Sequence, residues 1–156
     1  MTAGWAKLDA ALAECALHAQ VLSDAAAALP AAFDAQMVAH VDAERRRWLD
    51  QTAYRFMKLQ DSLGEKVLPG LLAATLDPLP PEATFAERLQ RLERLGALPS
   101  VERWKLLREV RNSLAHEYPE HPDLQAAALT RLVGGARELL SFWAAARAFA
   151  DRHVKP

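Results

Sequence analysis

The sequence has 156 residues, of which 51% are apolar, and a net charge of −1 when its histidines are neutral. This length and apolar content predict a single domain, residues 1–156, with a core of its own, and they exclude a disordered chain. The near-zero charge gives no support for a general DNA-coating protein, which would normally be basic throughout. It leaves nucleic-acid binding open, because the segment 45–58 is strongly positive.

The first predicted helix covers residues 5–29, where apolar residues recur at spacings of four and three. Pro30 ends it, because proline cannot continue a helix. The only cysteine of the sequence, Cys15, falls on this apolar face and is expected to be a small core residue. A single cysteine excludes an intramolecular disulfide and a cysteine-based zinc site within one chain.

The second predicted helix begins between residues 33 and 38 and continues to about residue 63, with one apolar face. Gly64 and the pair Pro69-Gly70 predict a break or kink, followed by one more helical turn over residues 71–74. Residues 77–81, Asp-Pro-Leu-Pro-Pro, then form a stiff loop.

The third predicted helix covers residues 85–95. Thr84 and Glu87 form a capping box before it, and Gly96 provides a left-handed residue after it. Its apolar face is expected to consist of Phe85, Leu89, Leu92 and Leu95.

Ser100 caps the fourth predicted helix, which continues to about Tyr118, where Pro119 prevents further helix. The fifth runs from Pro122 to about residue 152, with six residues facing inward: Leu124, Leu132, Leu139, Leu140, Trp143 and Phe149. Five helices joined by short connections predict an all-α fold, an up-and-down antiparallel bundle.

Charged residues interrupt every long apolar stretch, and the N-terminal residues lack a charged segment followed by an apolar one. The sequence therefore predicts neither a membrane span nor an export signal. Together with the unpaired cysteine, this favours a reducing compartment, and the expected location is the cytoplasm.

The segment 111–118, Arg-Asn-Ser-Leu-Ala-His-Glu-Tyr, places polar residues where a helical bundle does not require them. Asn112 and Ser113 are weak helix formers within the last turns, and His116 follows where the helix ends. One interpretation is a solvated helix end, in which the histidine interacts with the helix dipole. The other is a reactive site, with Arg111 as a permanent cation and a histidine that titrates near neutral pH.

The pattern R-x4-H-x-Y of residues 111–118 resembles the signature of the HEPN superfamily, in particular of the HepT-like toxins of HEPN/MNT (minimal nucleotidyltransferase) toxin–antitoxin systems. The flanking sequence RNSLAHEYP and the upstream segment YRFMKLQDSLGEKVLPGLL also resemble this group. The resemblance implies a metal-independent endoribonuclease that needs no cofactor, with Arg111 and His116 as catalytic residues. It further implies a homodimer and a cognate nucleotidyltransferase antitoxin that can attach AMP to Tyr118.

The residue types suit this chemistry, because RNA carries its own nucleophile, the 2′-hydroxyl. His116 can accept the hydroxyl proton, while the guanidinium of Arg111 binds the phosphate oxygens as negative charge builds on them. The products then end in a 2′,3′-cyclic phosphate. Four residues are expected to support RNA binding, although the two on the second helix also suit a solvated face: Asn112, Ser113, Lys58 and Asp61. Asn112 either binds phosphate or orients His116, since the two are four residues apart on one helix.

Residues five apart on a regular helix point about 140° away from each other, so Arg111 and His116 converge only if the helix ends between them or if two copies of the chain build the site. Two other functions remain open: a non-catalytic HEPN scaffold that partners a nucleotidyltransferase, and a helical adaptor. Tyr118 also suits simple packing of the helix end. His116 and His121 with Glu117 do not make a metal site, because a third ligand is not evident. Three further histidines have no evident partner: His18, His40 and His153.

Overall fold

The computed structural model describes residues 2–76 and 78–156, and all regular secondary structure within those ranges is helical. A π-helical turn, η1 (Leu63–Val67), joins the third helix to the fourth. The α-helices are α1 (Ala3–Ala27), α2 (Ala35–Ala39), α3 (Ala43–Ser62), α4 (Leu68–Ala73), α5 (Phe85–Leu95), α6 (Val101–Ser113) and α7 (Pro122–His153). The predicted all-α fold is confirmed.

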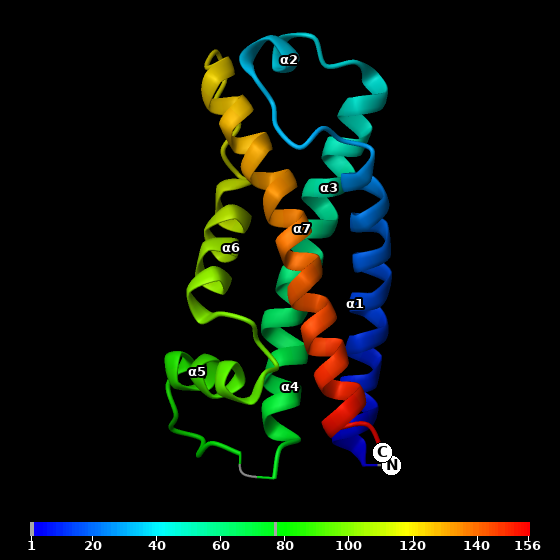
Figure 1. The fold of residues 1–156 in the computed structure, drawn as a ribbon, viewed down its shortest axis with the longest axis vertical. Coiled ribbons are helices and arrows are strands. Elements are labelled where there is room, and N and C mark those ends of the chain that lie inside the picture. Colours follow the sequence, from blue (N-terminus) through cyan, green and yellow to red (C-terminus); the bar gives the residue numbers. More distant parts are fainter. Residues whose placement is uncertain (1, 77) are drawn as a thin grey trace.

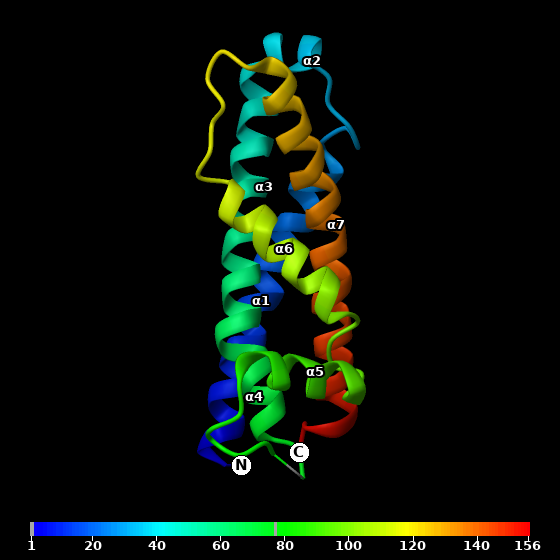
Figure 2. The same cartoon turned by 90° about the vertical axis from the view of Figure 1, so that its left-hand side faces the viewer.

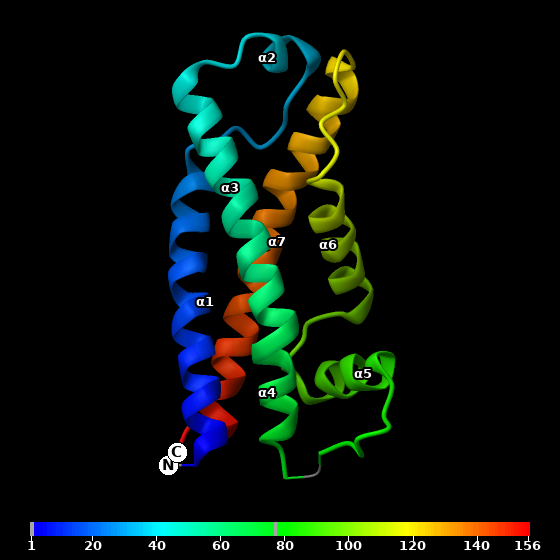
Figure 3. The same ribbon diagram turned by 180° about the vertical axis from the view of Figure 1, so that it is seen from behind.

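The long helices alternate in direction along the long axis of the molecule (Figure 1). Helix α1 leads away from the end where both termini lie, α3 and α4 return to it, α6 leads away again, and α7 returns. Seen from behind, the stack of α3 and α4 runs beside α1 (Figure 3). Helix α5 departs from the expected up-and-down order, because it lies crosswise below α6 (Figure 2).

The second predicted helix is in fact two helices, because two aspartates act as N-caps within it. The Asp34 side chain accepts a hydrogen bond from the backbone N–H of Met37, and Asp42 accepts one from Arg45, both at 2.8 Å. An N-cap residue has extended backbone angles, so each aspartate begins a new helix. The predicted start at residues 33–38 belongs to α2, and the long helix begins only after Asp42.

Of the break or kink predicted at Gly64 and the pair Pro69-Gly70, the break is absent. Helix α3, η1 and α4 follow one another without a loop between them, and Gly64 lies in the π-helical turn. Both glycines are positions of close approach between helices. An added Cβ would lie 3.2 Å from Trp104 Cζ2 at Gly64 and 2.9 Å from Leu8 Cδ1 at Gly70. They therefore allow tight packing against α6 and α1 rather than breaking the helix.

One hydrophobic cluster joins α1, α3, η1, α4, α5, α6 and α7. Phe56 of α3 and Trp104 of α6 are among its largest fully buried side chains, and Cys15 of α1 is buried in it, as predicted. Burial raises the pKa of the Cys15 thiol to about 12, so the thiol stays protonated. Three residues expected to face inward are instead exposed, and each lies in the first or last turn of its helix: Phe85, Leu95 and Leu124.

The predicted caps of α5 are present. The backbone N–H of Glu87 donates to the Thr84 hydroxyl, and the Glu87 carboxylate accepts from the backbone N–H of Thr84. Gly96 follows the helix with φ of 86°, a left-handed conformation that glycine adopts without strain. The short helix α5 therefore has well-defined ends at both sides.

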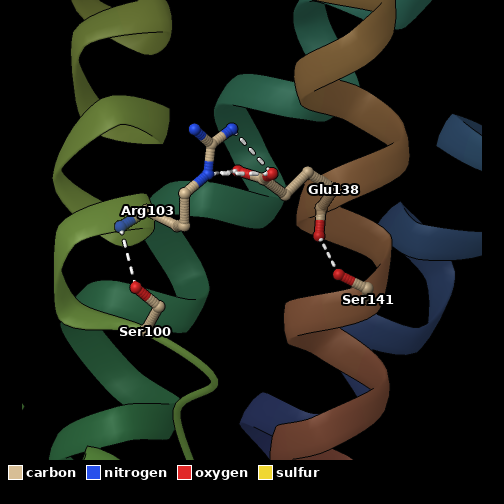
Figure 4. Close-up of polar contacts among 4 residues, drawn as sticks. All are labelled: Ser100, Arg103, Glu138 and Ser141. Carbon is tan, nitrogen blue, oxygen red and sulfur yellow. Dashed lines mark hydrogen bonds and ion pairs between the residues drawn. The ribbon is translucent and has the colours of Figure 1, made fainter.

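An ion pair connects the start of α6 to the middle of α7 (Figure 4). Ser100 caps α6 as predicted, since its hydroxyl accepts from the backbone N–H of Arg103 at 3.1 Å. The Arg103 guanidinium donates through Nε and Nη2 to the Glu138 carboxylate, at 2.7 to 3.1 Å. The Ser141 hydroxyl donates to the Glu138 carbonyl one turn away. Because the arginine side chain is 54% exposed, the pair orients α6 more than it stabilises the fold.

Helix α7 begins at Pro122, as predicted, and ends at His153. Of the predicted loop 77–81, residue 77 lies outside the described residues, and residues 78–81 contain neither helix nor strand. Within residues 2–76 and 78–156, no helix has both the length and the apolar character needed to cross a membrane.

Candidate functional site

Helix α6 ends at Ser113, well before the expected end near Tyr118. The Ser113 hydroxyl donates to the carbonyl of Val110 at 2.7 Å, and the backbone N–H of His116 donates to the Ser113 carbonyl at 3.0 Å. A serine hydroxyl that donates to a nearby backbone carbonyl competes with helical hydrogen bonding, here in a segment of weak helix formers. The helix therefore ends between Arg111 and His116, which is one of the two arrangements that the spacing allows.

Arg111, in the last turn of α6, forms a two-pronged ion pair with Asp61 of α3. Its Nε donates to one carboxylate oxygen and its Nη2 to the other, both at 3.0 Å. The hydrogen bonds to Asp61 raise the pKa of the Arg111 guanidinium, so it stays charged. Each side chain is 35% exposed, which leaves the pair open to a ligand. The sequence predicts Asp61 as an RNA-binding residue or as part of a solvated face, and it gives no sign of this contact with Arg111.

A cleft surrounds this ion pair, between α3, η1, α5 and α6. We name it the Arg111 cleft, and it is lined by Gln60, Asp61, Gly64, Glu65, Phe85, Trp104, Arg108, Arg111 and Asn112. The buried indole Nε1 of Trp104 has no hydrogen-bond partner in the described part of the chain. The cleft thus contains two arginines, Arg108 and Arg111, and two carboxylates, so its charges balance. It can bind a phosphate only where an arginine keeps N–H groups that are not engaged by a carboxylate.

His116 lies in a different cleft, between α2, the start of α3, the loop 114–121 and the start of α7. We name this the His116 cleft. Its volume is about 490 Å³, and it is lined by Val38, Val41, Arg46, Leu49, Asp50, Ala53, Ser113, Leu114, His116, Glu117, Tyr118, Gln125, Ala128, Leu129 and Leu132. The ring centres of His116 and Tyr118 are 6.1 Å apart. His116 is exposed and Tyr118 is half-buried, so both are accessible from the cleft.

The loop that carries His116 and Tyr118 is fixed by Gln125 of α7. The Gln125 amide donates to the carbonyl of Tyr118 at 3.0 Å and, more weakly, to that of Glu117 at 3.4 Å. Tyr118 and Glu120 have φ of 50° and 64°, left-handed conformations that are uncommon for residues with a side chain. Gln125 was not predicted as a site residue, because a glutamine near the start of a helix gives no indication of a contact with the preceding loop.

The structure divides the predicted site residues between the two clefts. Asn112 lies with Arg111, and Ser113 lies with His116. The expectation that Asn112 and His116 share a helix face is wrong, because α6 ends between them. Lys58 is half-buried on α3 and lines neither cleft. Arg111 and His116 therefore do not share a cleft within one chain.

A polar cluster between α1 and α3 was not expected from the sequence, which predicts no partner for His18. Arg55 approaches His18 Nδ1 at 2.9 Å through its Nη1, and the buried His18 Nε2 lies 3.7 Å from Glu14. Glu14 in turn accepts hydrogen bonds from Ser62 and Lys66, at 3.0 and 2.8 Å. Burial, and then the charge of Arg55, lower the pKa of His18. The imidazole is therefore neutral, with Nδ1 as the acceptor.

A group of three or more histidine, cysteine, aspartate or glutamate side chains placed to hold a metal ion is not found among residues 2–76 and 78–156. No family model matches the chain, and neither a curated protein nor a solved structure matches it.

Proposed function

We propose that the chain is a HEPN-type endoribonuclease, the cytoplasmic toxin of a toxin–antitoxin pair. His116 accepts the proton of the RNA 2′-hydroxyl, and Arg111 stabilises the negative charge that develops on the attacked phosphate. The bond from the 2′-oxygen to phosphorus forms and the bond from phosphorus to the 5′-oxygen breaks. The 5′-oxygen takes a proton from water and leaves as a hydroxyl, and a 2′,3′-cyclic phosphate remains on the other product. The observation that supports this best is the geometry of Arg111.

The Asp61 carboxylate engages only one edge of the Arg111 guanidinium, through Nε and Nη2. The Nη1 group and the second hydrogen of Nη2 are left to bind phosphate oxygens. Asp61 thus holds the guanidinium in a fixed orientation while part of its donor set stays available in a cleft. Preorganised donors of this kind are what a developing oxyanion requires.

The separation of Arg111 from His116 supports a site built from two copies of the chain. Since the two residues line different clefts, a dimer that brings the Arg111 cleft of one chain to the His116 cleft of its partner would complete the catalytic set. A two-fold axis would create two such sites. It would also join positive charge from both chains, which helps a protein of net charge −1 bind a polyanion.

Tyr118 is the residue through which we expect a nucleotidyltransferase antitoxin to neutralise the toxin. Its side chain lines the His116 cleft, so an attached AMP would place a phosphate and a base where RNA has to bind. The result would be occlusion of the cleft and repulsion of the RNA backbone.

One observation favours a second candidate function, a non-catalytic scaffold that partners a nucleotidyltransferase. The ion pair of Arg111 with Asp61 is also what a purely structural arginine would form. The two functions differ in whether loss of the arginine abolishes a reaction or only weakens the fold.

The deciding experiment is incubation of the purified chain with total RNA, followed by analysis of the product ends. We expect cyclic phosphate ends, no effect of EDTA, and a loss of about 100-fold or more for Arg111→Ala and for His116→Ala. A mixture of the two variants should regain activity, since a mixed dimer keeps one complete site. Cleavage by His116→Ala at the wild-type rate would show the assignment to be wrong, and absence of any cleavage by wild type would favour the scaffold.

A further inference from the structure

The His116 cleft contains a second arginine, Arg46, which the HEPN-like pattern does not include. Arg46 lies in the first turns of α3, just after the capping residue Asp42. Its side chain is exposed, and its guanidinium has no hydrogen bond or ion pair with any residue that the structure describes. Asp50, one turn further on, lines the same cleft without pairing to it. An unpaired cation therefore lies in the same cleft as His116, the proposed proton acceptor.

The rest of the cleft has two kinds of lining. Leu49, Leu129 and Leu132 give it an apolar wall, and the Tyr118 ring lies at the side of His116. Its volume of about 490 Å³ is within the range of pockets that bind small ligands. An apolar wall with an aromatic ring suits the flat face of a base, and a free guanidinium suits a phosphate.

We propose that the His116 cleft binds one nucleotide of single-stranded RNA, with its phosphate on Arg46 and its base against Tyr118 and the leucine wall. This inference rests on the proposed function and names the part of the substrate that the cleft holds. The carboxylates of Asp50 and Glu117 also line the cleft. They disfavour a polyphosphate, but they can accept hydrogen bonds from ribose hydroxyls or base amines, so a single phosphodiester unit fits the mixed lining best.

Arg46 and Arg111 then have different tasks. Arg46 belongs to the same chain as His116 and binds a phosphate in the ground state and the transition state alike. Arg111 acts on the charge that appears only during the reaction. Loss of uniform binding raises KM and leaves kcat unchanged, whereas loss of a transition-state contact lowers kcat. The two arginines can therefore be separated by kinetics.

The test uses a short RNA oligonucleotide of mixed sequence with 2′-O-methyl groups, which cannot be cut because its nucleophile is blocked. Binding is measured by fluorescence anisotropy over a series of salt concentrations. Arg46→Ala should weaken binding by about 10-fold or more, the effect of one lost charge-assisted contact. It should also reduce the slope of log affinity against log salt by about 0.7, the value for one phosphate on a single strand.

Arg47→Ala is the matched control, because it removes the same charge from the next position on α3, which is exposed and does not line the cleft. We expect it to change binding much less, and Arg46→Lys to recover part of the affinity. Both wild-type and variant chains are checked for helix content by circular dichroism. Equal losses in Arg46→Ala and Arg47→Ala, or no loss in either, would overturn the proposal.

Cleavage kinetics separate failure of this inference from failure of the proposed function. If RNA is cut in a His116-dependent way but Arg46→Ala has the wild-type KM, the nucleotide site is wrong and the ribonuclease assignment stands. If the wild-type chain cuts no RNA, yet binds the methylated oligonucleotide in an Arg46-dependent way, the nucleotide site stands and the ribonuclease assignment is wrong.

Discussion

Gly134 and Gly135 are neighbours in the middle of α7, and the structure predicts opposite effects when each is changed to alanine. A glycine inside a helix costs about 0.5 to 1 kcal/mol relative to alanine, mainly in backbone entropy. At Gly134 an added Cβ meets no atom within 4 Å. Gly134→Ala should therefore raise the free energy of unfolding by about 0.5 to 1 kcal/mol.

At Gly135 the same methyl group would meet the core. Its Cβ would lie 3.3 Å from Phe56 Cε2 and 3.5 Å from Val110 Cγ1, and the Phe56 side chain is fully buried. Forcing a methyl group into a packed core costs about 1 to 3 kcal/mol, which outweighs the gain in helix propensity. Gly135→Ala should therefore lower the free energy of unfolding.

The comparison of the two variants isolates packing, because the helix propensity term is the same in both. The difference between them should be about 1 to 3 kcal/mol, measured by urea denaturation followed by circular dichroism. In thermal melts it should amount to a separation of about 2 to 12 °C, with Gly134→Ala melting higher. If Gly135→Ala were as stable as Gly134→Ala, the described packing of α7 against α3 and α6 would be wrong.

Three further predictions concern the polar groups. Asp61→Ala should reduce RNA cleavage by at least about 10-fold, because Arg111 loses its orientation. The free energy of unfolding, measured by urea denaturation, should fall by only about 1 kcal/mol or less, since the ion pair is partly exposed. A large loss of stability with normal cleavage would show that the ion pair is structural. His18 has a lowered pKa in the fold, so its contribution to stability is present above its ordinary pKa near 6.5 and is lost as the pH falls below it. The urea midpoint should therefore fall from pH 7 to pH 5 more steeply in wild type than in His18→Gln, and parallel curves would contradict this. When the chain is co-expressed with the proposed nucleotidyltransferase antitoxin, we expect a mass increase of one or more AMP units, and Tyr118→Phe should abolish it. An unchanged mass increase in the variant would place the modification elsewhere.

Features set by local chemistry were predictable from the sequence. The capping box of Thr84 and Glu87, the left-handed Gly96 and the cap at Ser100 each depend on residues within a few positions, and each is present. Asp34 and Asp42 are caps of the same kind, so the start of α2 and the separation of α2 from α3 are also set by local residues. The glycines at positions 64 and 70 were less informative, because their close approaches to Trp104 and Leu8 are contacts between helices.

Features set by distant contacts were not predictable. Pro119 determines only the last residue that α6 could include. Helix α6 in fact ends at Ser113, and the loop that follows is held by a hydrogen bond from Gln125 to the carbonyl of Tyr118. The partners of His18 and Arg111 lie 37 and 50 residues away, on α3. A pattern of spacing along one helix contains no information on which side chain of another helix will face it.

Helix α7 contacts the segments that carry Arg111 and His116, and so helps to set the distance between the two residues. Near its middle, Gly135 permits the close approach of Val110, one residue before Arg111. Near its start, Gln125 holds the loop of His116 at the carbonyl of Tyr118. Because both contacts are made to one continuous helix, a hinge within the chain is a poor way to bring Arg111 to His116. A second chain that supplies the missing residue needs no such distortion, so we expect a composite site rather than a rearranged monomer.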